Sequence, residues 1–212
     1  MIAIVDYGMG NLRSVQKALQ KLGFEAEVTA DADAIRRADK LILPGVGAFG
    51  AAMENLHRAG LDQAIREFIN TGKPFLGICL GLQLLFDYSE ETWTTEHERG
   101  LGILRGRVVR FPEGLSDAQG KPLKVPHIGW NALHFTRQDT LFRDVEEGAH
   151  VYFVHSYFPE PEDKGVITAL SDYGVRFCCA VQYQNVRAVQ FHPEKSSAVG
   201  LRILHNFAQQ TD

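Results

Sequence analysis

The sequence predicts an α/β fold in which a mostly parallel, open sheet is flanked by helices on both faces, with additional antiparallel strands in the second half. Three observations support this. Short apolar runs alternate with helically spaced segments through the first half, turn residues separate them, and short strand patterns dominate the second half. Because we find no repeat, low-complexity tract or linker, we expect residues 1–212 to form a single domain.

Four strand–helix units are expected in the first half. Val15, Leu19 and Leu22, for example, recur at helical spacing, and Gly23 ends the pattern. The expected strands are 2–5, 25–28, 40–43 and 75–78, and the expected helices are 12–22, 31–38, 61–69 and 80–86.

The second half has many short strand patterns and one helix, expected at residues 197–209. These strands could extend the parallel sheet or form an antiparallel layer beside it. Polar residues predict exposed loops at 87–102 and 113–124. The strands are expected at 107–111, 131–135, 151–154, 166–170, 177–183 and 187–191.

The overall composition excludes several classes of protein. The net charge of −4 argues against a nucleic-acid binder, and the sequence has neither a signal peptide nor a membrane-spanning apolar run. Three cysteines cannot build a disulfide framework, so we expect a cytoplasmic protein, with Cys178 and Cys179 packed in a strand. The histidines are scattered without metal-ligand spacing, so we expect neither a metal nor a cofactor.

The stretch Gly77-Ile78-Cys79-Leu80-Gly81 stands where an apolar strand turns into a helix. A nucleophile at such a turn is lifted clear of the sheet, and flanking glycines let strand and helix pass closely. The following helix would favour a thiolate at Cys79, and the Leu80 N–H would face an oxyanion on the substrate. The alternative is a buried cysteine that only fills the core.

A thiolate in acyl transfer needs a base and a group that orients the base. His192-Pro193-Glu194 offers both, because Pro193 favours an extended His192, and residues i and i+2 of an extended chain share one side. Glu194 could then hold the imidazole. The same tripeptide could also be the turn that starts the last helix.

The loop Pro44-Gly45-Val46-Gly47 also follows a predicted strand. Such a loop can give a second backbone N–H to an oxyanion hole, so Gly45, Val46 and Gly47 join Leu80 as candidates. It could instead cradle a phosphate, but the Gly-Lys-Ser/Thr end of a P-loop is missing.

In this order along the chain, the three pieces resemble the class I, triad-type glutamine amidotransferases. Within that family the chain is most similar to the glutaminase subunits of imidazole glycerol phosphate synthase, a histidine-pathway enzyme. The similarity is carried by five segments of the sequence: residues 6–12, 44–47, 126–131, 151–157 and 190–196.

The resemblance implies a flavodoxin-like fold, glutamine as substrate, and a Cys79-His192-Glu194 triad that forms a glutamyl thioester. It implies that Gln83 holds glutamine. The released ammonia would pass to a separate cyclase subunit, forming a heterodimer that makes imidazole glycerol phosphate and aminoimidazole carboxamide ribonucleotide. Four residues would lie near the interface with that subunit: Asn11, Trp130, Tyr152 and Lys195.

The oxyanion loop contains Val46 rather than a run of glycines. The Gly45–Val46 peptide can therefore serve as a switch, because glycine tolerates the backbone angles of both orientations. We expect its N–H to face away from the site in the isolated subunit.

Three other readings stay open from the sequence. The chain could be a cysteine hydrolase of the same architecture that acts on another amide or γ-glutamyl bond without a partner. It could be a glutaminase of the pyridoxal-phosphate-synthase type, which the Trp130 and Lys195 segments do not support. It could be a binding subunit without activity, although such a protein would be expected to lose part of the triad.

Overall fold

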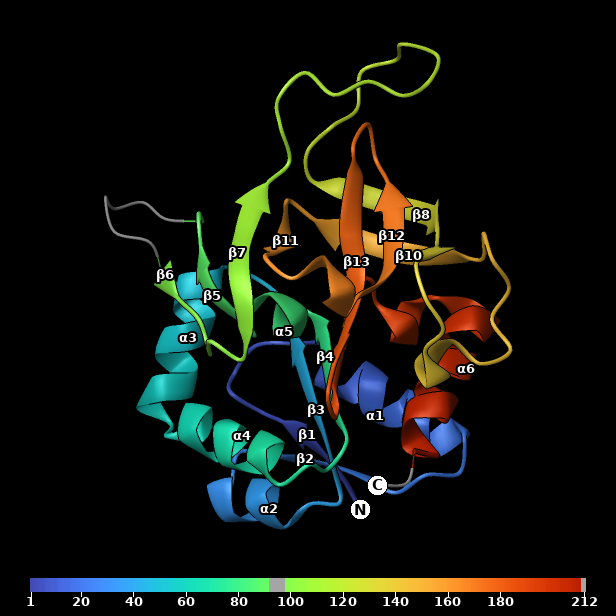
Figure 1. Ribbon diagram of the computed structural model, residues 1–212. Helices are drawn as coiled ribbons and strands as arrows, with labels where there is room; N and C mark the ends of the chain where they lie inside the picture. Colours follow the sequence, from blue (N-terminus) through green and yellow to red (C-terminus); the bar gives the residue numbers. More distant parts are fainter. Residues whose placement is uncertain (92–97, 211–212) are drawn as a thin grey trace.

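The computed structural model describes residues 1–91 and 98–210, and its centre is an eight-stranded sheet (Figure 1). The strand order is β2-β1-β3-β4-β14-β13-β12-β9; the first five strands run parallel and the last three continue antiparallel. The parallel strands are β2 (Ala26–Thr29), β1 (Ile2–Val5), β3 (Lys40–Gly45), β4 (Phe75–Cys79) and β14 (Val186–Val189). The antiparallel strands are β13 (Arg176–Tyr183), β12 (Ile167–Asp172) and β9 (His134–Phe135).

Helices cover both faces of this sheet, as the sequence predicts (Figure 1). Strands β1 and β4 are buried along their whole length, which explains their unbroken apolar sequences. The helices packed on one face are α2 (Ala32–Arg37), α3 (Phe49–Arg58) and α4 (Leu61–Asn70). Those on the other face are α1 (Leu12–Lys21) and α6 (Ser197–Ala208).

The second half of the chain both extends the sheet and builds separate layers, so the two arrangements left open by the sequence occur together. A four-stranded sheet has the order β11 (Tyr157–Pro161), β7 (Leu104–Arg110), β5 (Phe86–Ser89) and β6 (Glu98–Arg99). An antiparallel pair joins β8 (His127–Ala132) to β10 (His150–His155). Short 3₁₀ turns occur at Thr140–Phe142, Lys164–Val166 and Pro193–Lys195.

The helices of the first half differ from the prediction at two places: one helix is missed, and one is shorter than expected. Helix α3 was not predicted, because its buried stripe contains one small alanine and it starts directly after the glycine-rich loop. The helix expected at 80–86 is the single turn α5 (Leu80–Gln83), and Phe86 already begins β5. Every residue from Leu80 to Phe86 is buried, so the segment has no polar face from which a helical period could be read.

The strand predictions fail where the local chemistry is atypical. The segment 87–102, expected to be a loop, contains most of β5 and all of β6. Its residues 92–97 lie outside the described residues. The strand expected at 131–135 is divided between β8 and β9. Strand β11 was not predicted because it contains Pro159 and Pro161, which are tolerated since β11 lies at a sheet edge.

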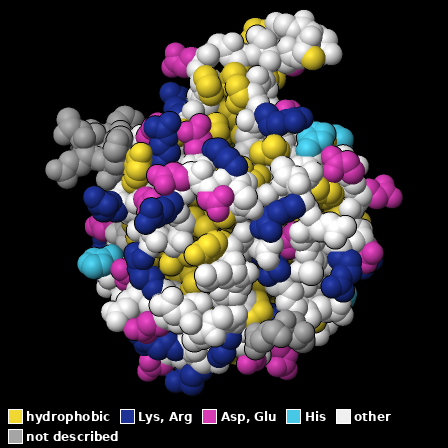
Figure 2. All heavy atoms as spheres, viewed as in Figure 1, with side chains coloured by type: hydrophobic (Ala, Val, Ile, Leu, Met, Phe, Trp, Pro, Cys, Tyr) yellow, Lys and Arg dark blue, Asp and Glu magenta, His cyan; other side chains and the backbone are white. Residues whose placement is uncertain are grey.

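The molecular surface carries mixed charge. Figure 2 shows Lys and Arg side chains interspersed with Asp and Glu across the visible face. The predicted loop 113–124 is present and projects from the body, with one bridge between Ser116 and Pro122 (Figure 1). Within residues 1–91 and 98–210, no helix is both long and apolar enough to cross a membrane.

Candidate active site

Cys79 stands at the turn between β4 and α5, at the carboxyl edge of the parallel sheet. Its backbone angles, φ 55° and ψ −110°, are rarely adopted by residues other than glycine. A Cβ on Gly81 would overlap the carbonyl oxygen of Leu43, and one on Gly77 would lie 2.7 Å from the carbonyl oxygen of Gly81. The structure therefore contains the sharp turn expected from the glycine pattern, although α5 is only one turn long.

His192 reaches the same edge from the neighbouring strand. Strands β14 and β4 are adjacent and parallel, with Val189 opposite Ile78, so the segments that follow them emerge side by side. As the sequence predicts, His192 is extended (φ −99°, ψ 97°). Pro193 begins a 3₁₀ turn that carries Glu194 back toward the imidazole, so the tripeptide is also the turn before α6 that the sequence left open.

His192 and Glu194 form a buried ion pair. The Nδ1 atom of His192 lies 2.9 Å from Oε1 of Glu194, and their side chains are 2% and 1% exposed. The same Oε1 accepts a longer hydrogen bond, 3.5 Å, from Nδ2 of Asn11. Ser196 holds the turn from behind, because its hydroxyl donates to the His192 carbonyl at 2.7 Å and accepts from the Tyr152 N–H at 2.9 Å.

The charge state of His192 depends on Cys79. Burial alone lowers the pKa of His192, but a negative Cys79 and the Glu194 carboxylate outweigh burial and raise it to about 10. The Nε2 atom of His192 is buried and has no hydrogen-bond partner among the described residues. With Glu194 on Nδ1, this leaves Nε2 as the nitrogen available for proton transfer.

Two glutamine side chains continue the site beyond the cysteine. Nε2 of Gln190 lies 3.7 Å from the Cys79 sulfur, and Oε1 of Gln190 accepts a 3.2 Å hydrogen bond from Nε2 of Gln83. Gln83 also donates to the Tyr157 carbonyl at 2.9 Å. The sequence reasoning gave Gln190 no role, although it precedes His192 by two residues, a spacing that in an extended chain puts both on one side.

The loop Pro44–Gly47 lies against the elbow. Gly45 is the strand partner of Cys79, and a Cβ at Gly45 would overlap the Tyr7 hydroxyl and lie 2.8 Å from Cβ of Leu80. The Tyr7 hydroxyl donates to the Pro44 carbonyl at 3.0 Å. Burial, and next a negative Cys79, raise the pKa of Tyr7, so Tyr7 stays a neutral donor. Tyr7 is thus a further residue of the site that the sequence reasoning did not assign.

Three of the four residues expected at a partner interface lie together. Trp130 and Tyr152 are cross-strand partners on β8 and β10, with ring centroids 5.9 Å apart in an edge-on arrangement. Nζ of Lys195 lies 5.9 Å from the centre of the Tyr152 ring. Trp130 is 48% exposed, so it presents a large apolar surface to solvent. Asn11 does not join these three side chains but contacts Glu194.

The reacting groups are almost closed off from solvent. Cys79 is 6% exposed and His192 is 2% exposed, whereas Val46 in the adjoining loop is 39% exposed. A cavity of about 730 Å³ lies elsewhere, lined by residues between Phe135 and Val145, and contains none of the triad. The nearly buried Cys79 thus adjoins a loop that is open to solvent at Val46.

The glutamine amidotransferase class I family matches residues 3–211 of this sequence. The chain belongs to this family. It is 55% identical over 207 residues to the imidazole glycerol phosphate synthase subunit HisH of Geobacter metallireducens, covering 98% of this chain and 97% of that one. It is 51% identical over 210 residues to the HisH subunit of Aquifex aeolicus, covering 99% and 96%.

Solved structures agree with this class I amidotransferase fold. A glutamine amidotransferase crystal structure superimposes with a TM-score of 0.72 at 21% identity, covering 98% of this chain and 99% of that one. The PurLQS structure from Thermotoga maritima gives a TM-score of 0.72 at 20% identity, covering 97% and 96%. These two likenesses support the predicted α/β architecture, while the membership of the family rests on the sequence matches.

Proposed function

We propose that this chain is the glutaminase subunit of imidazole glycerol phosphate synthase, hydrolysing glutamine to glutamate and ammonia. The ammonia would go to a separate cyclase subunit, which makes imidazole glycerol phosphate and aminoimidazole carboxamide ribonucleotide. Near-complete coverage of the HisH relatives supports the assignment. The observation that carries the chemistry is the 2.9 Å contact of His192 Nδ1 with Glu194 Oε1, at the sheet edge where Cys79 stands.

In the proposed mechanism Cys79 attacks the side-chain carbonyl of glutamine, and the N–H groups of Val46 and Leu80 stabilise the oxyanion. His192 then donates its Nε2 proton to the departing ammonia, leaving a glutamyl thioester. Acylation removes the negative charge from Cys79 and therefore one of the interactions that raise the pKa of His192. The imidazole, neutral after giving its proton to ammonia, therefore stays neutral, and its Nε2 acts as the base that activates water for hydrolysis.

Gln83 is proposed to help hold the substrate. It is buried, and its side chain is fixed by the Tyr157 carbonyl and by Gln190, which contacts Cys79. Gln190 therefore lies between the side chain of Gln83 and the sulfur of Cys79. A glutamine molecule bound over Cys79 would therefore meet a side chain that is already oriented.

The cyclase is proposed to dock on the face that carries Trp130, Tyr152 and Lys195. Lys195 follows Glu194 directly in the chain, so this face adjoins the triad. Docking would also favour the orientation of the Gly45–Val46 peptide that completes the oxyanion hole. The exposure of Trp130 and of Val46, together with a nearly buried Cys79, supports control by a partner.

We further propose that residues 1–212 work as one amidotransferase domain in the cytoplasm. The family match over residues 3–211 supports the single domain. Three free, buried cysteines and the absence of a spanning helix in the described part of the chain are compatible with a reducing compartment.

The proposed function is tested by measuring glutamate release from glutamine by the chain alone and with the cyclase and its nucleotide ligand. The proposal predicts weak release alone and at least 10²-fold faster release in the loaded complex. A hydrolase that is complete without a partner would show the same rate in both. A different amide substrate hydrolysed faster than glutamine by the complex would also overturn the assignment.

A further inference from the structure

A chain of hydrogen bonds runs from the substrate-holding side of the site through two buried histidines. The Tyr157 carbonyl oxygen accepts a hydrogen bond from Nε2 of Gln83 and also lies 2.8 Å from Nδ1 of His155. Nε2 of His155 lies 3.1 Å from Nδ1 of His127, whose Nε2 lies 2.7 Å from Oδ1 of Asn131. The sequence predicts no role for either histidine, because neither has metal-ligand spacing.

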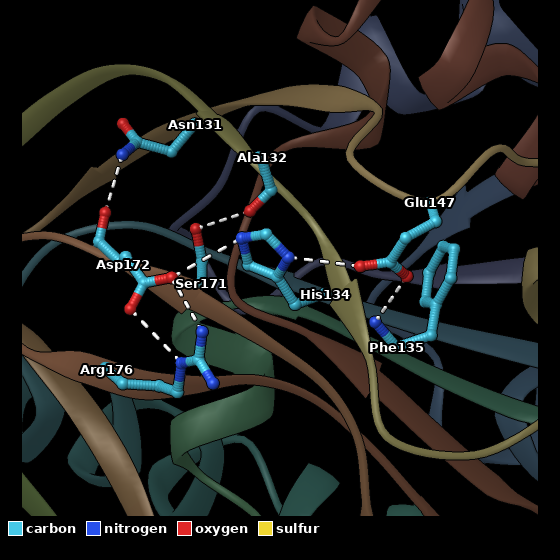
Figure 3. Close-up of polar contacts among 8 residues, drawn as sticks. All are labelled: Asn131, Ala132, His134, Phe135, Glu147, Ser171, Asp172 and Arg176. Atoms are coloured by element: carbon cyan, nitrogen blue, oxygen red, sulfur yellow. Dashed lines mark hydrogen bonds and ion pairs between the residues drawn. The ribbon is translucent and has the colours of Figure 1, made fainter.

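The outer end of this chain is fixed by a second backbone carbonyl. Nδ2 of Asn131 donates to the carbonyl oxygen of Asp172 at 2.7 Å (Figure 3). The Asp172 carboxylate is directed to other partners, Arg176 and His134, as Figure 3 also shows. Because a carbonyl can only accept, the Asn131 amide must turn its nitrogen outward and its oxygen toward His127.

The two fixed ends determine where the protons lie. His155 must carry a proton on Nδ1 to donate to the Tyr157 carbonyl, and His127 must carry one on Nε2 to donate to Asn131. Two neutral imidazoles have no further proton, so the nitrogens that face each other at 3.1 Å would both present lone pairs. Three contacts thus compete for two protons, and a third proton shared between the rings satisfies all three.

We propose that His127 and His155 are positioning residues that share one added proton below neutral pH and hold the Tyr157 carbonyl in place for Gln83. The inference rests on the proposed glutaminase function. Without the added proton, lone pairs of the two rings face each other; with it, the rings are joined while His155 still donates to Tyr157. A second proton has no acceptor and would break the bridge.

The surroundings of the pair agree with a single added charge. Aromatic side chains enclose it, with the Tyr173 ring stacked on His127 at 4.0 Å and the Phe111 ring 5.1 Å from His155. Tyr173 is a titratable neighbour, and its hydroxyl donates to the Lys124 carbonyl. Among the described residues, the charges that act on His155 are those of His127 and His192, and both lower its pKa, so a proton on His127 disfavours another on His155.

Burial lowers the pKa of both imidazoles, that of His155 to about 3. The first proton therefore enters the pair below pH 6.5, and the second only in strong acid. The pair is neutral in the alkaline range, where its two protons serve the Tyr157 carbonyl and Asn131 and the contact between the rings has none.

Imidazole nitrogen NMR on the full-length wild-type chain tests the proton count directly. Above pH 7.5 we expect His155 as the Nδ1–H tautomer and His127 as the Nε2–H tautomer. Between pH 7.5 and 5 both rings should change in one shared step that takes up one proton. Two separate one-proton steps, or no change in either ring down to pH 5, would overturn the proposal.

Kinetics of the complex with its cyclase test the positioning role. His155→Phe, which cannot donate to Tyr157, should raise the KM for glutamine about fivefold, the usual effect of one hydrogen bond, with a smaller change in kcat. His155→Asn keeps a donor at the position of Nδ1 and should restore KM. Thermal unfolding checks that both variants are folded. Equal KM values in the two folded variants would show that the pair has only a packing role.

His127→Phe is the matched control, because the ring joins an aromatic cluster and leaves the His155 contact with Tyr157 intact. At pH 7.5, where the pair carries no added proton, its KM should rise less than that of His155→Phe. Its KM should then vary less than that of wild type between pH 7.5 and 5.5. An unchanged pH dependence in His127→Phe would contradict proton sharing.

Discussion

His192 Nδ1 lies 2.9 Å from Glu194 Oε1, with both side chains buried and with Asn11 as a second donor to the same oxygen. The pair fixes which imidazole nitrogen faces Cys79. A carboxylate in this position both orients the ring and stabilises its charged form. The buried Oε2 of Glu194 has no partner among the described residues, so the stabilising charge is not shared with another donor there.

Replacement of the two residues should have unequal effects. His192→Ala removes the proton donor and should lower glutamine turnover on the order of 10³-fold, about 4 kcal/mol of barrier. Glu194→Gln should cost less, since an amide can hold the ring but cannot stabilise imidazolium. Steady-state kinetics of the reconstituted complex give both values, and a Glu194→Gln loss equal to that of His192→Ala would contradict the ranking.

Alkylation should distinguish the three cysteines. Cys178 and Cys179 are buried, as the sequence predicts, and burial raises the pKa of the Cys178 thiol to about 12 and that of Cys179 well above its usual range. Iodoacetamide should therefore label Cys79 first, and faster once the cyclase and its ligand are bound. Peptide mass spectrometry identifies the labelled site. Earlier labelling of Cys178 or Cys179 would revive a redox role for them.

Stability should fall in acid through His155. Burial lowers the pKa of His155 to about 3, so the native His127–His155 pair refuses a second proton that the unfolded chain binds below pH 6.5. The free energy of unfolding is therefore unaffected by this group above pH 6.5 and decreases as the pH falls from 6.5 toward 3. The free energy of unfolding is measured with urea at pH 7.5 and 4.5. Between these values the wild type should lose on the order of 2 kcal/mol more than His155→Asn. Equal losses would show that His155 does not titrate this way.

The oxyanion loop should control the rate. If the Gly45–Val46 peptide faces away in the free subunit, Leu80 is the only backbone donor, and the missing donor costs roughly 10²–10³-fold. Val46→Pro removes the N–H and should blunt the activation by cyclase and ligand while Cys79 stays reactive to iodoacetamide. Full turnover by the free subunit, or normal activation of a folded Val46→Pro variant, would rule out the switch.

The sequence predicts the parallel half of the fold well, because β1 and β4 are unbroken apolar runs and α1 has a clear amphipathic period. It fails around Leu80–Phe86, where complete burial removes the period, and at β11, where an edge position overrides the prolines. A local sequence pattern contains no information on complete burial or on an edge position, since both depend on which other elements pack against the segment.

The site shows the same division. The Gly77–Gly81 elbow and the His-Pro-Glu tripeptide are local motifs, so the sequence alone indicates them. Gln190 and the His127–His155 pair depend on contacts between residues far apart in the chain. The spacing of the two histidines in the sequence has no signature, and the pairing of β8 with β10 brings them together.

The most direct test of the central claim uses Cys79→Ala in the complex with the cyclase. Product formation is measured once with glutamine and once with an ammonium salt as nitrogen source. The account predicts that glutamine-dependent synthesis is abolished while ammonium-dependent synthesis persists, because only ammonia supply requires the thiolate. If the variant kept a tenth or more of its glutamine-dependent rate, Cys79 would not be the nucleophile.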